Sequence, residues 1–263
     1  MLNTRILRIL ITQEISIVLS VPEILLAEIK SLFYCERVND FSFESPDITI
    51  SIVDNLYVIS TLYETIECHV DEYLFYLVTT IENLAVSKFD ACVFHGSAVS
   101  CNSGKAIAFI GKSGSGKTTM MLNLINGLKC NSIADDLLFF SSDNMLSTVL
   151  LPYKIKPTSG YFQHSKNGKI NLRKVSINTS NMTFPVSAIV SVNYDSLSGS
   201  ETFCRQDFTH GFSLLIKNSR KAVNNKELAQ TVAFLLQTVP VYKMHYSNTP
   251  FALKCISELF MLS

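Results

Sequence analysis

Short apolar runs separated by polar turns make up most of the chain, and a smaller number of segments carry apolar residues at helical spacing. Runs at 15–20 and 48–53 predict strands, whereas 22–33, with proline at its first turn, and 71–84 predict helices. Strands alternate with polar turns after residue 160, and the segment 163–171 is the most polar loop. A helix at 226–239, a strand at 240–246 and a helix at 250–261 follow. The mixture of strands and helices is typical of an α/β protein.

The centre of the chain contains a phosphate-binding motif between a predicted strand and a predicted helix. Residues 111–118 read Gly-Lys-Ser-Gly-Ser-Gly-Lys-Thr and match the Walker A pattern G-x-x-x-x-G-K-[ST]. The preceding segment 105–110 is an apolar strand-like run, and 119–126 has helical spacing and stops at Gly127, a residue typical of the position after a helix. A Gly/Ser-rich surface turn that matches by chance is the alternative, but the flanking strand and helix favour a P-loop.

The motif assigns a role to each residue of the loop. Backbone N–H groups and the start of the helix would converge on the phosphates of ATP. Lys117 would reach the β- and γ-phosphates, and the Thr118 hydroxyl would bind Mg²⁺. The residues expected to bind the nucleotide are Gly111, Ser113, Gly114, Ser115, Gly116, Lys117, Thr118 and Thr119.

A histidine lies on the strand predicted just before the loop. The run Cys92-Val-Phe-His-Gly96 passes into a polar turn at 101–105 and returns as the strand that leads into the loop. If the two strands form a hairpin centred near Ser103, His95 lies opposite Gly111. A histidine there can bond a phosphate oxygen or a neighbouring carboxylate. The alternative is a histidine of the core or of a strand end, and the predicted pairing favours a role in the site.

Two adjacent carboxylates, Asp135 and Asp136, follow the predicted helix. The helix 117–127 descends about 16 Å from the loop, and the strand 131–135 climbs back by about 16 Å. The pair therefore returns to the level of the phosphates. Neighbouring residues at a strand end point to opposite sides, so one carboxylate can bind Mg²⁺ while the other accepts a proton. A solvated acidic turn is the alternative.

Lys156 is a weaker candidate. It lies in Pro152-Tyr-Lys-Ile-Lys156-Pro, where apolar and proline neighbours restrict it. Its side chain could face the phosphates or the substrate, although a surface lysine fits the sequence equally well.

Composition and charge exclude several classes of protein. Among the 263 residues, 48% are hydrophobic and 22 basic residues balance 22 acidic ones, which argues against a general nucleic-acid binder. Seven scattered cysteines without a C-x-x-C pair suit reduced thiols better than disulfides or zinc. No apolar run is long enough to cross a membrane, and the first residues are interrupted by Glu14 and lack a signal-peptide cleavage site. We therefore expect a cytoplasmic protein.

The segment 94–140 resembles the bacterial HPr kinase/phosphorylase family, because His-Gly, the phosphate loop and Ile-Ala-Asp-Asp occur in that order. The resemblance implies a P-loop kinase core of the HPr kinase and phosphoenolpyruvate carboxykinase type in residues 89–263, after a small N-terminal αβ region in 1–88. It makes His95 and Asp135 catalytic, with Asp135 as proton acceptor, Lys117 on the transferring phosphate, and Thr118 and Asp136 on Mg²⁺.

The second half resembles the shorter HPr-kinase-like proteins encoded beside ribosomally made, modified peptides. The residues that carry this likeness are Pro152 to Lys156 and the Pro-Val-Tyr run 240–242. The family's later segment, with an acidic metal ligand and a glycine-rich strand, has no counterpart. The resemblance implies an ATP- and Mg²⁺-dependent kinase of a Ser or Thr hydroxyl on a peptide or small protein, and a homo-oligomer is compatible with it. A small-molecule kinase and a nucleotide-gated regulatory module are the alternatives.

Overall fold

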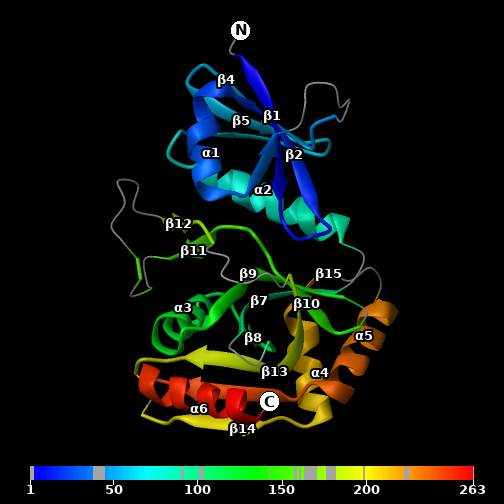
Figure 1. Ribbon diagram of the computed structural model, residues 1–263, viewed down its shortest axis with the longest axis vertical. Coiled ribbons are helices and arrows are strands. Elements are labelled where there is room, and N and C mark those ends of the chain that lie inside the picture. The colour runs from blue at the N-terminus through cyan, green and yellow to red at the C-terminus, as the bar shows by residue number, and fades with distance from the viewer. Residues whose placement is uncertain are drawn as a thin grey trace. The chain divides into compact units, whose positions relative to one another are not determined.

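The computed structural model divides the chain into two compact units (Figure 1). The first comprises Met1–Lys88, Leu150–Pro157 and Gln163–Val175, and the second comprises Phe89–Val149, Thr158–Phe162 and Ser176–Ser263. The structure describes residues 3–37, 45–89, 92–100, 104–141, 143–156, 159, 161–162, 171–175, 182–197, 199–221 and 225–262. The polar turn predicted around Ser103 and most of the loop predicted at 163–171 lie outside the described residues.

The first unit contains a six-stranded sheet in the order β3-β1-β2-β4-β5-β6. Buried Ile and Leu residues of β1, β2 and α1 form its core. A separate two-stranded ribbon, β11-β12, belongs to the same unit. The elements are β1 (Thr4–Leu10), β2 (Ser16–Pro22), the 3₁₀ turn η1 (Glu23–Leu25), α1 (Leu26–Leu32), β3 (Cys35–Arg37), β4 (Ile48–Val53), β5 (Leu56–Ser60), β6 (Thr65–Cys68), α2 (Tyr73–Lys88), β11 (Tyr153–Ile155) and β12 (Asn171–Arg173).

The second unit is built on a mixed sheet in the order β10-β9-β7-β8-β13-β16-β14, with β15 beside β7. Its elements are β7 (Cys92–Ser100), β8 (Ala106–Ile110), α3 (Lys117–Leu128), β9 (Asn131–Phe140), β10 (Met145–Ser147), β13 (Thr183–Tyr194), β14 (Thr202–Arg205), α4 (Phe208–Lys217), β15 (Ser219–Lys221), α5 (Asn225–Thr238), β16 (Val241–Tyr246) and α6 (Thr249–Leu262). The chain is thus a mixed α/β protein.

The fully buried strand β8 leads directly into the phosphate-loop motif and lies near the middle of this sheet. It pairs in antiparallel fashion with β7 and in parallel fashion with β13. The register of the hairpin is Gly96↔Ile110 to Ser100↔Ala106, which confirms the predicted centre at residue 103. The short strand β10 pairs with both β9 and β13, so the strands β10, β9, β7, β8 and β13 close into a ring.

Three local expectations need correction. Gly127 lies inside α3, and the helix ends at Leu128 because Lys129 adopts the left-handed conformation (φ 55°). The acidic pair is not at a strand end, since β9 continues to Phe140. Cys130 is disulfide-bonded, contrary to the expectation of reduced thiols, whereas Cys35, Cys68, Cys92, Cys204 and Cys255 are free. The scattered spacing of the cysteines gives no sign of this disulfide.

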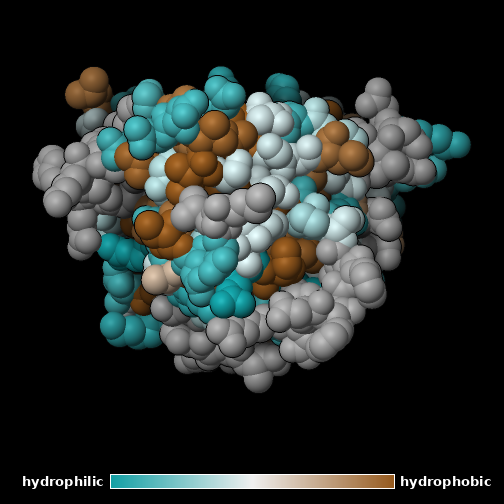
Figure 2. Space-filling model, turned by 90° about the horizontal axis from the view of Figure 1, so that it is seen from above, coloured by the Kyte–Doolittle hydropathy of each residue, from teal (hydrophilic) through white to brown (hydrophobic). Residues whose placement is uncertain are grey.

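The surface seen in Figure 2 mixes separate hydrophobic areas with hydrophilic ones. Exposed apolar side chains in the first unit include Ile24, Leu62 and Tyr63, which are 71%, 87% and 81% exposed. Single exposed apolar residues are common on folded proteins and do not define a site. Within the part of the chain that the structure describes, no helix is both long enough and apolar enough to span a bilayer.

Candidate active site

The backbone of the phosphate loop has the shape that an anion cradle needs. Gly111, Gly114 and Gly116 have φ angles of 149°, 84° and 94°, which residues with a Cβ rarely adopt. A Cβ on Gly111 would lie 2.7 Å from Ser115 Oγ and 2.8 Å from the carbonyl oxygen of Val192. Gly116 then caps the N-terminus of α3. The glycines therefore allow a compact loop whose N–H groups can point toward one anion.

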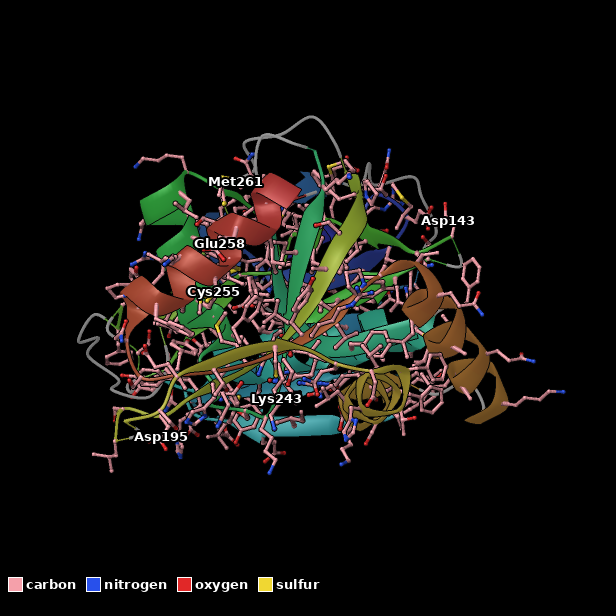
Figure 3. All side chains as sticks on the ribbon, turned by 90° about the horizontal axis from the view of Figure 1, so that it is seen from below. Asp143, Asp195, Lys243, Cys255, Glu258 and Met261 are labelled. Carbon is pink, nitrogen blue, oxygen red and sulfur yellow. The ribbon has the colours of Figure 1, made fainter. Side chains whose placement is uncertain are left out.

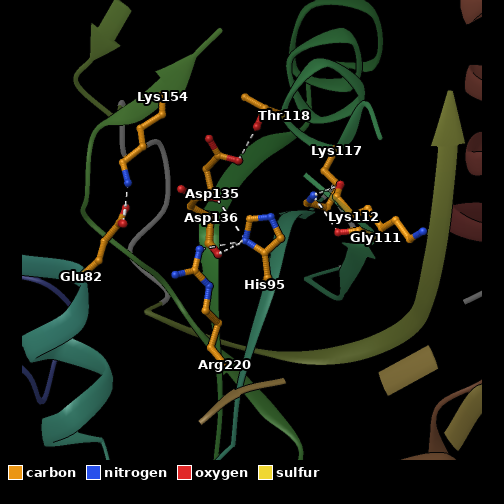
Figure 4. Close-up of polar contacts among 10 residues, drawn as sticks. All are labelled: Glu82, His95, Gly111, Lys112, Lys117, Thr118, Asp135, Asp136, Lys154 and Arg220. Atoms are coloured by element: carbon orange, nitrogen blue, oxygen red, sulfur yellow. Dashed lines mark hydrogen bonds and ion pairs between the residues drawn. The ribbon is translucent and has the colours of Figure 1, made fainter. Parts of the chain in front are cut away.

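Lys117, the lysine of the motif, is buried, with 7% of its surface exposed. Its Nζ donates to the carbonyl oxygens of Gly111 and Lys112, both at 2.9 Å (Figure 4). These bonds hold the ammonium group across the loop, where a phosphate would meet it. Ser115 Oγ is also buried, and among the described residues it has no hydrogen-bond partner. An unsatisfied buried hydroxyl inside the loop suits a site that takes a polar ligand.

Asp135 joins the loop through the hydroxyl of Thr118, which donates to Asp135 Oδ1 at 2.9 Å. Asp135 is only 8% exposed. Burial, reinforced by the nearby Asp136 carboxylate, raises the pKa of Asp135 from 3.8 to about 7. Since a cation beside this carboxylate would favour its ionised form, Asp135 and Thr118 together offer the hard oxygen donors that Mg²⁺ prefers.

Asp136 departs from regular strand geometry. Its φ of 68° places this non-glycine residue in the left-handed region, which Asp adopts more readily than most residues. Asp136 opposes Gly96 in the β7–β9 pair, and its Oδ1 lies 3.2 Å from Nδ1 of His95. The left-handed turn of the backbone breaks the simple alternation along the strand. Asp135 and Asp136 therefore have different partners, while their predicted division of roles, which rested on strand alternation, stays a prediction.

His95 makes its contacts through one ring nitrogen. Nδ1 lies 3.2 Å from the Asp136 backbone oxygen and 3.3 Å from a guanidinium nitrogen of Arg220 (Figure 4). The oxygens of Asp136 accept, so they need a proton on His95 Nδ1. The guanidinium of Arg220 only donates, so it needs the lone pair of Nδ1. The contacts therefore belong to alternative tautomers. Burial, with the charge of Lys117, lowers the pKa of His95 from 6.5 to about 4, so the ring is neutral at pH 7.

Arg220 belongs to none of the sequence motifs, and the structure brings it beside His95. The short strand β15 pairs with β7 through Ser219↔Phe94 and Lys221↔Val93, with an irregularity between the two pairs. The His95 N–H also donates to the carbonyl oxygen of Asn218 at 2.8 Å. A three-residue strand far from the motif gives no sequence signal of this pairing, so only the fold could identify Arg220.

Close packing explains why a glycine, Gly96, follows the histidine. A Cβ at this position would lie 2.4 Å from Leu138 Cδ1 and 2.5 Å from the carbonyl oxygen of Phe109. Gly96 pairs with Ile110 on one side and with Asp136 on the other. Its lack of a side chain therefore lets the strand that carries the acidic pair approach the strand that leads into the loop.

For the other residues predicted for the site, the surroundings give weaker evidence of a role. Ser113 and Gly114 are exposed at the tip of the loop. Thr119 Oγ1 lies 3.2 Å from Ser159 Oγ, within the same unit. Lys156 is exposed and belongs to the first unit, whereas the loop belongs to the second. The structure therefore brings Lys117, Thr118, Asp135, Asp136 and His95 together with Arg220, and the role of Lys156 stays a prediction.

The donor set fits a magnesium ion shared with a substrate. Among the residues that the structure describes, no group of three or more His, Cys, Asp or Glu side chains could hold a metal by itself. Mg²⁺ is usually bound by one or two carboxylates together with phosphates of the substrate rather than by an all-protein cage. Asp135 and Thr118, 2.9 Å apart beside the loop, meet that requirement.

The raised pKa of Asp135 predicts a pH-dependent cost to stability in the metal-free protein. The folded state holds the proton up to about pH 7, whereas the unfolded carboxyl loses it near 3.8. Stability should therefore fall as pH rises through this window, by a few kcal/mol in total. Asp135→Asn removes the charge and keeps an oxygen for Thr118. The variant should gain more stability over the parent at pH 8 than at pH 5.

Urea unfolding in EDTA at both pH values measures this difference. The lowered pKa of His95 has the opposite pH trend, but it is common to both proteins and largely cancels in the comparison. Equal stability gains at the two pH values would show that Asp135 is not a costly buried carboxylate.

Comparisons with known proteins give little support beyond the site itself. No family model matches the chain, and no curated protein matches it significantly. A solved structure to which the chain is similar is the Hpr(Ser) kinase/phosphatase from Coxiella burnetii, at 10% identity and a TM-score of 0.33. The match covers 65% of this chain and 99% of that one. A similarity of this size does not by itself establish a shared fold or function.

Proposed function

We propose that the protein is a kinase that uses ATP and Mg²⁺ to phosphorylate a hydroxyl group. The observation that carries the proposal is the second carboxylate. Asp135 bonds the loop hydroxyl of Thr118, while Asp136 lies beside His95 of the adjacent strand, and His95 also contacts Arg220. A protein that only binds ATP and changes shape needs one carboxylate near the metal. A second one, held by a histidine, supports a transfer reaction in which a proton must be removed.

In this reaction Asp136 accepts the proton of the acceptor hydroxyl. The hydroxyl oxygen forms a bond to the γ-phosphorus as the bond from that phosphorus to the bridging oxygen breaks, and ADP leaves. Lys117 and Arg220 stabilise the negative charge on the transferring group, and neutral His95 orients the Asp136 carboxylate. Mg²⁺, when bound, would neutralise charge on the phosphates, and Asp135 and Thr118 are the residues that would hold it.

This division of roles reverses the one that the family resemblance implies. Two observations favour it. Thr118 bonds Asp135, so the metal-binding hydroxyl and this carboxylate face the same point. In addition, the Asp136 side chain is 26% exposed whereas Asp135 is 8% exposed. A base must be reached by the acceptor hydroxyl, and the more accessible carboxylate meets that condition better.

The acceptor that we propose is a Ser or Thr side chain of a peptide or small protein, as the sequence resemblance implies. Support for this finer point comes from the motifs alone. The direct experiment incubates the protein with ATP, Mg²⁺ and a set of Ser- and Thr-containing peptides, and follows the mass added by one phosphoryl group. Metabolites with hydroxyl groups form the second set. Tight ATP binding without transfer to either set would favour the regulatory alternative.

Arg220 gives a test of the charge arrangement. Arg220→Ala should slow transfer by about 10²-fold or more, since removal of one stabilising donor has that order of effect. Arg220→Lys should recover part of the rate, because it restores the charge but not the planar fork. Steady-state rates with saturating ATP measure both. Arg205→Ala, a change of an exposed arginine on β14, is the matched control and should leave the rate unchanged. Equal rates for the parent and Arg220→Ala would remove Arg220 from the mechanism.

A further inference from the structure

Two tyrosines, Tyr194 and Tyr246, pack against the last residues of the phosphate loop. A Cβ on Gly116 would lie 2.7 Å from the hydroxyl of Tyr246 and 3.1 Å from Cβ of Tyr194. The Tyr194 N–H also donates to the carbonyl oxygen of Ser115 at 3.1 Å. These contacts tie the ends of β13 and β16 to the last residues of the loop.

The two rings differ in exposure. Tyr246 is 2% exposed, whereas Tyr194 is 45% exposed. Their centroids are 5.3 Å apart and their planes are tilted by 53°. The buried Tyr246 ring therefore packs against the Tyr194 ring, and part of the Tyr194 ring is exposed to solvent. The turn after β13 is exposed as well, and Figure 3 shows Asp195 of this turn at the edge of the view.

The order of the strands determines which part of a nucleotide would reach this ring. The acidic pair and His95 lie on β9 and β7, on one side of β8, while β13 and β16 lie on the other side. A nucleoside triphosphate is an extended molecule. When its γ-phosphate lies beside Asp135 and Asp136, its α-phosphate and nucleoside must leave across the opposite side of the loop.

We infer that Tyr194, supported by Tyr246, is the platform on which the nucleobase stacks. The inference rests on the proposed binding of a nucleoside triphosphate and adds the residue that holds its base. Every nucleobase has a π face, and an exposed aromatic ring next to a phosphate cradle is a suitable partner for it. Tyr194 thereby adds affinity for the nucleoside end, which the phosphate loop does not contact.

The test compares two ligands by isothermal titration calorimetry, namely ATP with Mg²⁺ and inorganic tripolyphosphate with Mg²⁺. Tyr194→Ala should raise the Kd for ATP by about 5- to 150-fold, the range that base–aromatic stacking gives. The Kd for tripolyphosphate, which has no base, should stay within about twofold. Tyr194→Phe keeps the ring and should bind ATP like the parent. Phe234→Ala changes an aromatic residue of similar exposure, 47%, on α5 and serves as the control.

Two results would overturn the inference. Equal weakening of both ligands by Tyr194→Ala would mean that the ring only supports the loop, and unchanged ATP affinity would mean that the base lies elsewhere. A parent protein that binds neither ligand would overturn the proposed function together with the inference. A parent that binds ATP through Tyr194 but transfers no phosphate would leave the inference standing and reject the kinase.

Discussion

Asp136→Asn should slow phosphoryl transfer by about 10²- to 10⁴-fold, the contribution usual for a general base, while the affinity for ATP with Mg²⁺ stays near that of the parent. The substitution is mild for the backbone, because asparagine tolerates the left-handed conformation at φ 68°. It removes the carboxylate that would take the proton and keeps the size of the side chain. Single-turnover transfer rates and calorimetric ATP affinities measure the two effects separately.

Asp135→Asn is the informative comparison, since it changes the neighbouring carboxylate. It should raise the Mg²⁺ concentration that gives half-maximal rate, because the Thr118–Asp135 pair loses its charge. Asp143→Asn is the surface control, as Asp143 is an exposed acid of the same unit (Figure 3), and it should change neither quantity. If Asp136→Asn shifts the Mg²⁺ requirement and Asp135→Asn does not, the roles are those of the family resemblance. If neither variant slows transfer, the kinase mechanism is wrong.

Lys117→Met should reduce transfer by at least about 10³-fold, because it removes the buried positive charge that faces the transferring phosphate. Methionine approximates the length of the lysine stem, so the core beneath the loop stays filled. The loss of the bonds to the Gly111 and Lys112 carbonyl oxygens is the remaining structural change. Transfer assays detect the effect, and circular dichroism confirms that the variant is folded.

A second readout of Lys117→Met does not depend on activity. The charge of Lys117 is one of the causes that lower the pKa of His95, after burial. Its removal should raise the pKa of His95 from about 4 toward the ordinary 6.5 without reaching it, because the ring stays buried. An NMR titration of the His95 ring protons measures this shift. A folded variant that transfers phosphate at the parental rate would remove Lys117 from the site.

The sequence identified the parts of the site that rest on local rules. Strand character on both sides of a turn predicted the hairpin register, and the motif predicted the order of strand, loop and helix. The level of Asp135 and Asp136 followed from the rise per residue of a helix and a strand. These inferences need only distances along the chain, which sequence spacing supplies.

The remainder depends on contacts between distant segments. Arg220 reaches His95 through a three-residue strand, and Tyr194 reaches Gly116 at the end of a strand that begins at Thr183. Aspartate has only a weak preference for the left-handed conformation, so the conformation of Asp136 could not be predicted from sequence. The surrounding structure maintains it. The scattered cysteine spacing also gave no sign of the disulfide of Cys130.

The ring of strands closed by β10 limits how far the strands around the candidate site can move apart. The strand β9 carries the two carboxylates and β13 ends at the tyrosine beside the loop, and β10 pairs with both. β10 contacts β9 at Phe140 and β13 at Thr183–Pro185, so it links the two strands at the ends away from the site and opposes their separation as hinged halves. If the protein is the kinase proposed above, entry of ATP and release of ADP would then involve the loop and segments outside the ring.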